Sequence, residues 1–314
     1  MKQNRESLLP KTGLDWLQQS GEPSLRFRVE RDLLDSEPDP SLQKEIASSK
    51  LITKIFAKMH PDGIWLHEGL GAGLDYSHGK TTHFILSYLA ELGLDKSDPR
   101  IDKAVNRYLN LNIQEKWLSG PDHLTGQSCL YTQNIRTFVL LGYRNDPRVQ
   151  MRIATLQSEI RHDDGMLCRR LSYTQKTKSC IRGTIKALMA YAELPELWST
   201  ESCKRTVNYF LSRNVYFKKT NPTEKIRGGM ATIFPFVIYC SLLEPLYALS
   251  KMGFGNHPAL DDAWMELEKR NNGEGKYKLD WYTNSLFMPG KKGEINEWVT
   301  FYAYLAKKYK EKRD

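Results

Sequence analysis

The sequence predicts an all-α fold in which five to six helical hairpins close into a ring, with buried helices inside and amphipathic helices outside. Three recurring features predict it: an Asp-Gly type of turn, a capped helix that is half polar, and a helix that is apolar around most of its circumference. Units of about 50 residues that cannot bury a core alone must stack on their neighbours. No alternation typical of strands competes with this interpretation.

The recurring turn is clearest in AKMHPDGIWL, residues 57–66, where a helical run stops at Pro-Asp-Gly and a Trp follows. Similar turns follow similar runs farther along, so that Gly63, Gly165 and Gly275 lie just over 100 residues apart, or about two units each. Asp-Gly supplies a tight turn between helices. We expect Trp65 to pack its ring between adjacent units.

The half-polar helices carry a start signal. Asp98 and Asp146 each precede Pro-Arg and can cap a helix whose first residue is proline. Apolar residues at helical spacing then form one stripe, at Ile101, Ala104, Val105 and Tyr108. These outer helices are expected at 42–58, 99–112, 147–160, 200–213 and 257–270.

The remaining helices are apolar on more than one face and are therefore expected to be buried. Three of them end on glycine, a favoured residue after a helix C-terminus. These inner helices are expected at 22–34, 81–93, 128–142, 179–194, 236–253 and 295–309. The contrast between the two kinds of helix favours a closed ring over an open solenoid. We expect one domain over 1–314, with 1–13 and 309–314 as frayed ends.

The composition is that of an ordinary globular chain of 314 residues, with 40% hydrophobic and 26% charged residues. No apolar run is long enough to span a membrane, and the N-terminus lacks a secretory signal pattern. Five Cys without a C-x-x-C pair favour reduced thiols and a cytoplasmic location. The formal charge is +9, and much of the basic excess lies at 306–314, which is most simply a solvated helix end. Nucleic acid is not expected as a partner, because no basic block is interleaved with aromatic residues.

The turn KMHPDGIW, residues 58–65, resembles the QW-type repeat of terpenoid cyclases: Gly63 and Trp65 match, and Met59 stands where the Gln belongs. From about residue 14 the chain resembles the squalene-cyclase and protein-prenyltransferase β-subunit superfamily, and most closely its stand-alone prenyltransferase-like proteins of prokaryotes. The resemblance implies an (α/α) toroid with a central cavity open at one end, which would hold an isoprenoid or other apolar ligand.

The acid motif of squalene-type cyclases, D-x-D-D, is absent from the sequence. Protonating an alkene needs an unusually strong, positioned acid. The Asp pairs at 163–164 and 261–262 are explained as turn and helix-cap residues. Cationic cyclisation of the squalene type is therefore not expected.

Prenyltransferase β subunits hold zinc with an Asp, a Cys and a His, so the resemblance raises a zinc site at the mouth of the ring, with Cys129, Cys180 and His83 as its ligands. Cys240, His78, Asp122 and His123 lie at comparable positions. The alternative is that the thiols are small core residues, because neighbouring helix axes are about 9–10 Å apart. No other cofactor is expected.

Two glycine-containing connections, 67–83 and 218–236, are expected to cross the mouth of the cavity, where long loops commonly bind ligands. In the second loop, Lys225 and Arg227 could hold an anion such as a diphosphate, or could simply be solvated. The candidate ligand-binding residues at the mouth are Tyr76, His78, Lys80, His83, Tyr131, Arg227 and Phe236.

Three functions remain open. The first is an enzyme that binds an isoprenoid or other apolar small molecule in the central cavity, which requires that side chains do not fill that cavity. The second is a non-catalytic helical-repeat scaffold or binding protein, favoured by the missing motifs. The third is a hydrolase or lyase acting on sugars, which needs two facing carboxylates. Glu244 and Glu297 lie on inner helices but are not placed by the sequence.

Overall fold

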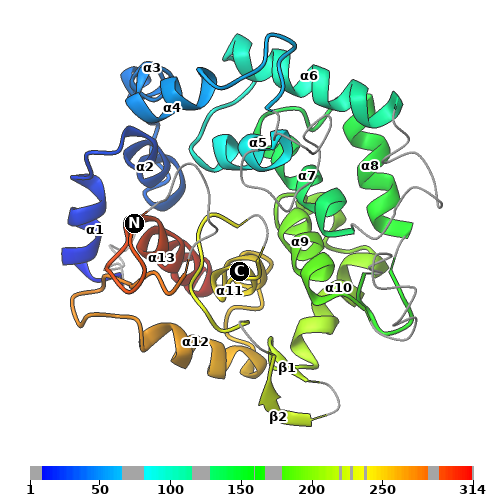
Figure 1. The fold of residues 1–314 in the computed structure, drawn as a ribbon. Helices are drawn as coiled ribbons and strands as arrows, with labels where there is room; N and C mark the ends of the chain where they lie inside the picture. The colour runs from blue at the N-terminus through cyan, green and yellow to red at the C-terminus, as the bar shows by residue number, and fades with distance from the viewer. Residues whose placement is uncertain are drawn as a thin grey trace, which may run out of the picture.

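The computed structural model describes residues 9–65, 81–114, 128–158, 160–166, 179–218, 221–226, 229–236, 239–281 and 290–312. Helices dominate this part of the chain and form two concentric layers, so the predicted all-α toroid is confirmed (Figure 1). No helix of the described ranges is both long enough and apolar enough to cross a membrane.

The inner layer repeats six times in the described residues. It consists of α2 (Pro23–Arg28) continued by the π-helical η1 (Val29–Leu33), α5 (Thr82–Glu91), α7 (Ser128–Leu140), α9 (Ile181–Ala192), α11 (Leu243–Lys251) and α13 (Glu297–Glu311). Every residue of α5 is buried, as are those of α9 from Gly183 onward. These helices are apolar around their circumference because neighbours surround them.

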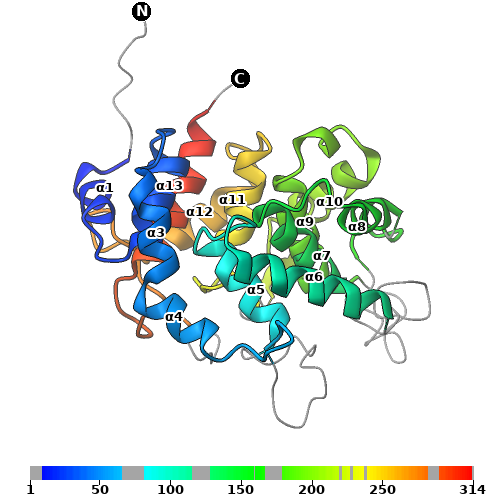
Figure 2. The ribbon, with the colours of Figure 1, turned by 90° about the horizontal axis from the view of Figure 1, so that it is seen from above.

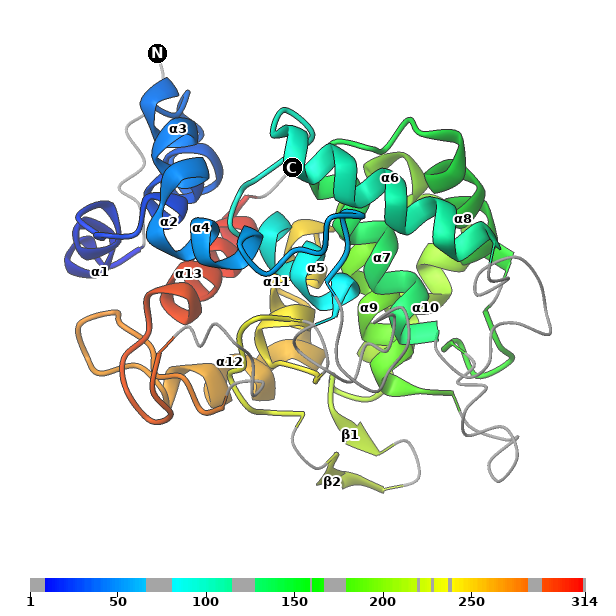
Figure 3. The same cartoon turned by 45° about the horizontal axis from the view of Figure 1, so that its top comes forward.

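The outer layer consists of α1 (Lys11–Gln18), α3 (Pro40–Ser48), α4 (Lys50–Phe56), α6 (Pro99–Gln114), α8 (Pro147–Ser158), α10 (Glu201–Leu211) and α12 (Asp261–Glu268), with short 3-10 turns η3 (Pro195–Leu197) and η4 (Pro258–Leu260). Helices α6, α8 and α10 lie outside α5, α7 and α9 (Figure 3). The four stripe residues predicted for α6 are all fully buried. Figure 2 shows the same layers from above.

The repeat motifs link successive units. Arg100 donates its backbone N–H to Asp98 (2.9 Å), while its guanidinium binds the same carboxylate and the carbonyl of Ala47 on α3 (2.9 Å). The Asp146–Arg148 pair repeats this arrangement against α6. The motif therefore caps one outer helix and fastens it to the outer helix before it.

Trp65 packs between units, as its place after the turn suggests. Gly63 adopts a left-handed conformation, with φ at 90°, which glycine tolerates without strain. The Trp65 indole then donates to the Ile55 carbonyl of α4 (2.9 Å), while its backbone amide donates to the Thr82 hydroxyl of α5 (2.9 Å). The residue joins an outer helix to the next inner helix.

Several boundaries differ from the prediction. The helix expected at 42–58 is divided, because Ser49 has extended backbone angles and caps α4. The inner helix expected from 236 begins only at Leu243, and an antiparallel hairpin of β1 (Phe217–Lys218) and β2 (Asn221–Lys225) was not foreseen. Helix α1 starts at Lys11 and α13 reaches Glu311, so helices extend into both of the terminal ranges named above.

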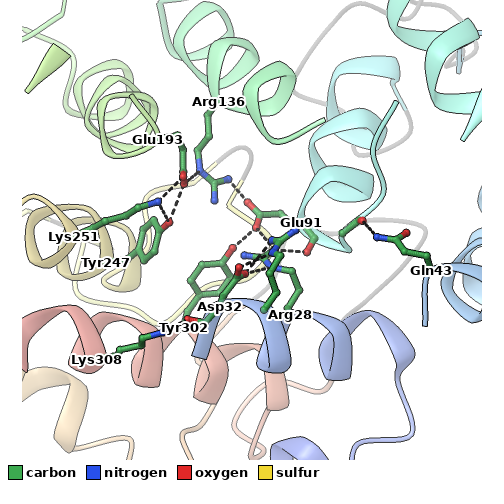
Figure 4. A network of polar contacts seen from close by, with 12 residues as sticks. Arg28, Asp32, Gln43, Glu91, Arg136, Glu193, Tyr247, Lys251, Tyr302 and Lys308 are labelled. Carbon is green, nitrogen blue, oxygen red and sulfur yellow. Dashed lines mark hydrogen bonds and ion pairs between the residues drawn. The ribbon is translucent and has the colours of Figure 1, made fainter. Parts of the chain in front are cut away.

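A network of buried charges joins the inner helices near their C-terminal ends (Figure 4). The Glu91 carboxylate, at the end of α5, accepts hydrogen bonds from Arg136 of α7 and from the Tyr302 hydroxyl of α13. Arg28 of α2 lies 3.7 Å from the same carboxylate and donates to the Glu91 carbonyl (2.6 Å). One carboxylate therefore holds four inner helices together.

The network continues to the other side of the ring. Glu193, just after α9, accepts from Lys251 (2.6 Å) and from the Tyr247 hydroxyl (2.9 Å), both on α11, and lies 3.5 Å from Arg136. Burial alone would raise the pKa of Glu193, but Lys251 and Arg136 outweigh it and lower the pKa to about 2. Opposite charges thus compensate each other at the closed end of the ring.

We predict that Glu91→Gln lowers the free energy of unfolding by about 3–5 kcal/mol, because it leaves two buried arginines without their shared carboxylate. Urea unfolding followed by circular dichroism measures this. Arg144→Met is the matched control, since Arg144 and Glu196 form an ion pair with 42% and 43% exposed side chains. It should cost less than about 1 kcal/mol. Equal effects of the two substitutions would contradict the closing role of Glu91.

The low pKa of Glu193 gives a pH-dependent prediction. Its folded-state pKa lies below the unfolded value, so its stabilisation is complete above about pH 4.5 and is lost as the pH falls toward 2. Over pH 3–4.5, Glu193→Gln should make the pH dependence of the free energy of unfolding shallower, by at most about 1.4 kcal/mol per pH unit. Urea midpoints across this range measure the slope, and an unchanged slope would refute the assignment.

Candidate functional site

The interior of the ring is occupied by aromatic side chains between α5, α11 and α13. The Phe234 ring stacks on Trp298 of α13, with centroids 5.0 Å apart and planes 6° apart, and contacts Tyr88 of α5. The Phe236 ring packs on Tyr302 at 4.5 Å. These rings are buried. The central cavity expected from the family resemblance is therefore filled in this region by the segment 233–236.

An open cleft lies beside these buried aromatic side chains, at the end of the ring where the inner helices begin. Its volume is about 860 Å³. The lining comes from the start of α9 and from the segments that precede α11 and α13. The residues are Ile181, Arg182, Tyr216, Ile226, Gly229, Ala231, Ile233, Tyr239, Cys240, Asp280, Trp281 and Lys292. Most of the wall is apolar, and the charged groups are Arg182, Asp280 and Lys292.

Two irregular segments that line the cleft, around Thr232 and Asp280, lie side by side and are joined by hydrogen bonds. The Thr232 amide donates to Asp280 (3.0 Å), and the Thr232 hydroxyl donates to the carbonyl of Lys278 (2.7 Å). Asp280 also accepts from Arg270 (2.8 Å), next to the end of α12.

Just before α11, the Ser241 amide donates to the Glu244 carboxylate (2.7 Å) and the Leu242 amide donates to the Ala231 carbonyl (2.8 Å). These amides are therefore satisfied outside a helix, and the helix predicted from 236 begins only at Leu243.

Aromatic rings face each other within the cleft. The rings of Tyr239 and Trp281 meet edge to face, with centroids 4.3 Å apart. The Arg182 guanidinium lies 5.7 Å from the centroid of the Tyr239 ring. Trp281 remains 38% exposed, which is unusual for so large an apolar side chain in a tightly packed protein. An exposed ring beside cations is a surface suited to a ligand with apolar faces and polar edges.

The thiol of Cys240 also lines the cleft. Burial raises its pKa to about 12, with a further contribution from the nearby Glu244 carboxylate, while Lys186 and Arg182 act in the opposite direction. Because the thiolate is the nucleophile and the metal ligand, this environment opposes both roles at neutral pH.

The proposed zinc ligands do not come together. Among the described residues, no group of three His, Cys, Asp or Glu side chains could hold a metal ion. Cys180 caps α9 by accepting the Gly183 amide at 3.5 Å, and Cys129 is buried at the start of α7. The structure therefore does not support the site of Cys129, Cys180 and His83.

His83 is a buried residue of the inner ring and does not line the cleft. Its Nδ1 lies 2.7 Å from the Asn134 side-chain oxygen, and Asn134 donates to the Tyr108 hydroxyl (2.9 Å). Burial lowers the pKa of His83 to about 4, so the imidazole is neutral at pH 7. An amide oxygen can only accept, so Nδ1 carries the proton.

The other residues predicted at the mouth of the cavity lie in different parts of the structure or outside the described residues. Tyr131 is buried, and its hydroxyl donates to the Arg152 carbonyl of α8 (2.6 Å). Phe236 is one of the aromatic residues in the interior of the ring, where it packs on Tyr302. Lys225 binds Glu266 on the surface (2.7 Å). Tyr76, His78, Lys80 and Arg227, with Asp122 and His123, lie outside the described residues.

The two inner-helix glutamates are not a facing catalytic pair. Glu244 is fully buried in an ion pair with Lys186, which leaves it no access to a ligand. Glu297 accepts a hydrogen bond from the Ser20 hydroxyl (2.9 Å), and burial raises its pKa. Sequence reasoning missed Arg182, Tyr239, Asp280, Trp281 and Lys292. For Asp280 and Trp281, the run LDWY at 279–282, an acid beside two aromatic residues, was a visible signal.

Comparisons with known proteins agree with the fold. No protein-family model and no curated protein matches the sequence. A solved polysaccharide lyase is similar over 97% of this chain and 90% of its own, with a TM-score of 0.51 and 12% identity. A glycosyl hydrolase family 88 protein from Bacteroides vulgatus covers 97% of this chain and 92% of its own, with a TM-score of 0.47 and 11% identity. The first similarity supports the α/α-toroid architecture, and the second is too weak to add to it.

We predict that Cys240 resists alkylation although it lines the cleft. A shift of its pKa from 9 to about 12 lowers the thiolate fraction near pH 8 by about a thousandfold. Iodoacetamide treatment at pH 8 followed by peptide mass spectrometry should find Cys240 unmodified in the folded protein and modified after unfolding in urea. Rapid modification of the folded protein would show that its thiol has an ordinary pKa.

Proposed function

We propose that this protein binds a saccharide in the cleft at the N-terminal ends of α9, α11 and α13, as a carbohydrate-processing member of the α/α-toroid fold. The observation that carries the proposal is the exposed Trp281 ring, which packs on Tyr239 and lines the same cleft as Arg182, Asp280 and Lys292.

The chemistry of this surface fits a sugar better than a purely apolar chain. A pyranose ring has apolar C–H faces, which an aromatic ring can cover, and a rim of hydroxyl groups that need donors and acceptors. Arg182 and Lys292 provide charged donors, and Asp280 provides an acceptor. Two cations against one carboxylate favour a saccharide that carries an acidic group.

The size of the cleft and the fold support the same proposal. A volume of about 860 Å³ lies within the range of small-molecule sites, roughly 300–1,000 Å³. A solved structure that shares the fold is named a polysaccharide lyase, so the architecture can accommodate a carbohydrate substrate. Fold similarity alone does not carry function, and the residues of the cleft must do so.

The second candidate is the isoprenoid or other apolar ligand implied by the family resemblance. The observation that favours it is the apolar wall formed by Ile181, Ile226 and Ile233. The filled ring interior opposes it, since an extended isoprenoid would need a long enclosed cavity. If the protein is a non-catalytic scaffold, no small molecule is expected to bind in the cleft.

Isothermal titration with a panel of acidic and neutral oligosaccharides and with farnesyl diphosphate tests the proposal. We expect an acidic oligosaccharide to bind, and Trp281→Ala to weaken it by about tenfold through loss of ring contact. Met265→Ala is the control, because Met265 is 57% exposed on α12 and does not line the cleft. Binding of farnesyl diphosphate without any saccharide, or no binding at all, would refute the proposal.

A further inference from the structure

Lys186 of α9 is a fully buried cation that does not line the cleft. Its ammonium donates to the Phe236 carbonyl (2.9 Å), to the Tyr239 carbonyl (3.2 Å) and to the Glu244 carboxylate. An ammonium has three donors, so every one of them is used. Two of the three acceptors belong to the irregular segment that comes before α11.

Glu244 extends the same set of contacts. Its second carboxylate oxygen accepts the Ser241 amide (2.7 Å), and the Ser241 hydroxyl accepts the Ile233 amide (3.0 Å). The Leu242 amide then closes the segment on the Ala231 carbonyl (2.8 Å). The Lys186–Glu244 pair therefore holds the Phe236 and Tyr239 carbonyls and the Ser241 amide, next to the backbone bond between Leu242 and Ala231.

This arrangement is costly as a source of stability alone. Removing two charges from water carries a penalty that a buried ion pair often fails to repay, and apolar residues of similar volume can replace such pairs without loss. What apolar residues cannot do is orient two backbone carbonyls. The specific consequence of Lys186 is thus the path of the backbone.

The segment that Lys186 holds serves two places. Phe234 and Phe236 fill the ring interior, whereas Ile233, Tyr239 and Cys240 line the cleft. Tyr239 in turn supports the exposed Trp281. A shift of the Tyr239 backbone would therefore move the aromatic surface of the cleft.

We propose that Lys186 is the positioning residue of the cleft, which holds the carbonyls of Phe236 and Tyr239 against the inner ring and so sets the orientation of Tyr239 and Trp281. The inference rests on the proposed function for its consequence in ligand binding. The positioning itself can be measured without a ligand.

The test compares Lys186→Met with Arg136→Met. Both remove a buried cation from an inner helix, but Arg136 forms its ion pairs with Glu91 and Glu193, whereas Lys186 binds the carbonyls of Phe236 and Tyr239. The double variant Lys186→Met/Glu244→Met removes the unpaired carboxylate and keeps the test possible where the single variant fails to fold. Hydrogen exchange followed by mass spectrometry reports on residues 229–242. Fluorine NMR of 5-fluorotryptophan protein reports on Trp281, whose signal is assigned with Trp281→Phe.

We expect both Lys186 variants to accelerate exchange in 229–242 at least tenfold and to shift the Trp281 signal, while Arg136→Met lowers thermal stability without either change. An acidic oligosaccharide that binds the wild type should bind these variants at least tenfold more weakly. Unchanged exchange and an unchanged Trp281 signal in the double variant would overturn the inference, as would altered exchange with unaltered affinity. Altered exchange and an altered Trp281 signal, with no saccharide bound by the wild type, would support the positioning role and refute the proposed function.

Discussion

The shared carboxylate of Glu91 is the interaction on which this fold depends. It joins helices α2, α5, α7 and α13, although Glu91 and Tyr302 are 211 residues apart in the sequence. Inner helices that are apolar on all sides can only be buried if the ring closes. Closure brings their few charged residues together, and these charges must then satisfy one another. Ion pairs between buried side chains therefore hold the inner helices together at this end of the toroid. Glu193 and Lys251 belong to the same network.

Closure also determines where a ligand can bind. Charged side chains meet near one end of the ring, and the rings of Phe234, Phe236 and Trp298 occupy part of its interior. The segment that fills the ring then turns outward and becomes a wall of the cleft. The protein accordingly places its candidate site beside the ring axis. Lys186 and Glu244 stand where the two parts of this segment meet.

Much of the architecture could be predicted from the sequence, because it follows from local chemistry. The stripe of α6, the caps at Asp98 and Asp146 and the turn at Gly63 each depend on neighbours within a few residues. The break at Ser49 could not be predicted, since a serine is compatible with both a helix interior and a cap. The path of the chain before α11 involves contacts with Asp280 and Lys186, which are remote in sequence and could not be foreseen.

The candidate site was mostly beyond the reach of sequence reasoning. The cysteines and His83 were attractive because their side chains can bind metal, but burial and local hydrogen bonds account for them. The exposure of Trp281 is a property of the tertiary structure, as is the proximity of Arg182 to Tyr239. Polar residues within apolar runs were a usable signal. Glu91, Arg136 and Lys186 are charged residues within otherwise apolar stretches of the inner helices, and each takes part in a buried ion pair.

A crystal structure of the protein soaked with an acidic oligosaccharide would test most directly whether a saccharide binds in the cleft beside Trp281. We expect electron density for the sugar in the cleft, with one pyranose ring against Trp281 and the acidic group near Arg182 or Lys292. Phe234 and Phe236 should remain in the interior of the toroid. Ligand density within the ring, with these two phenylalanines displaced, would contradict it.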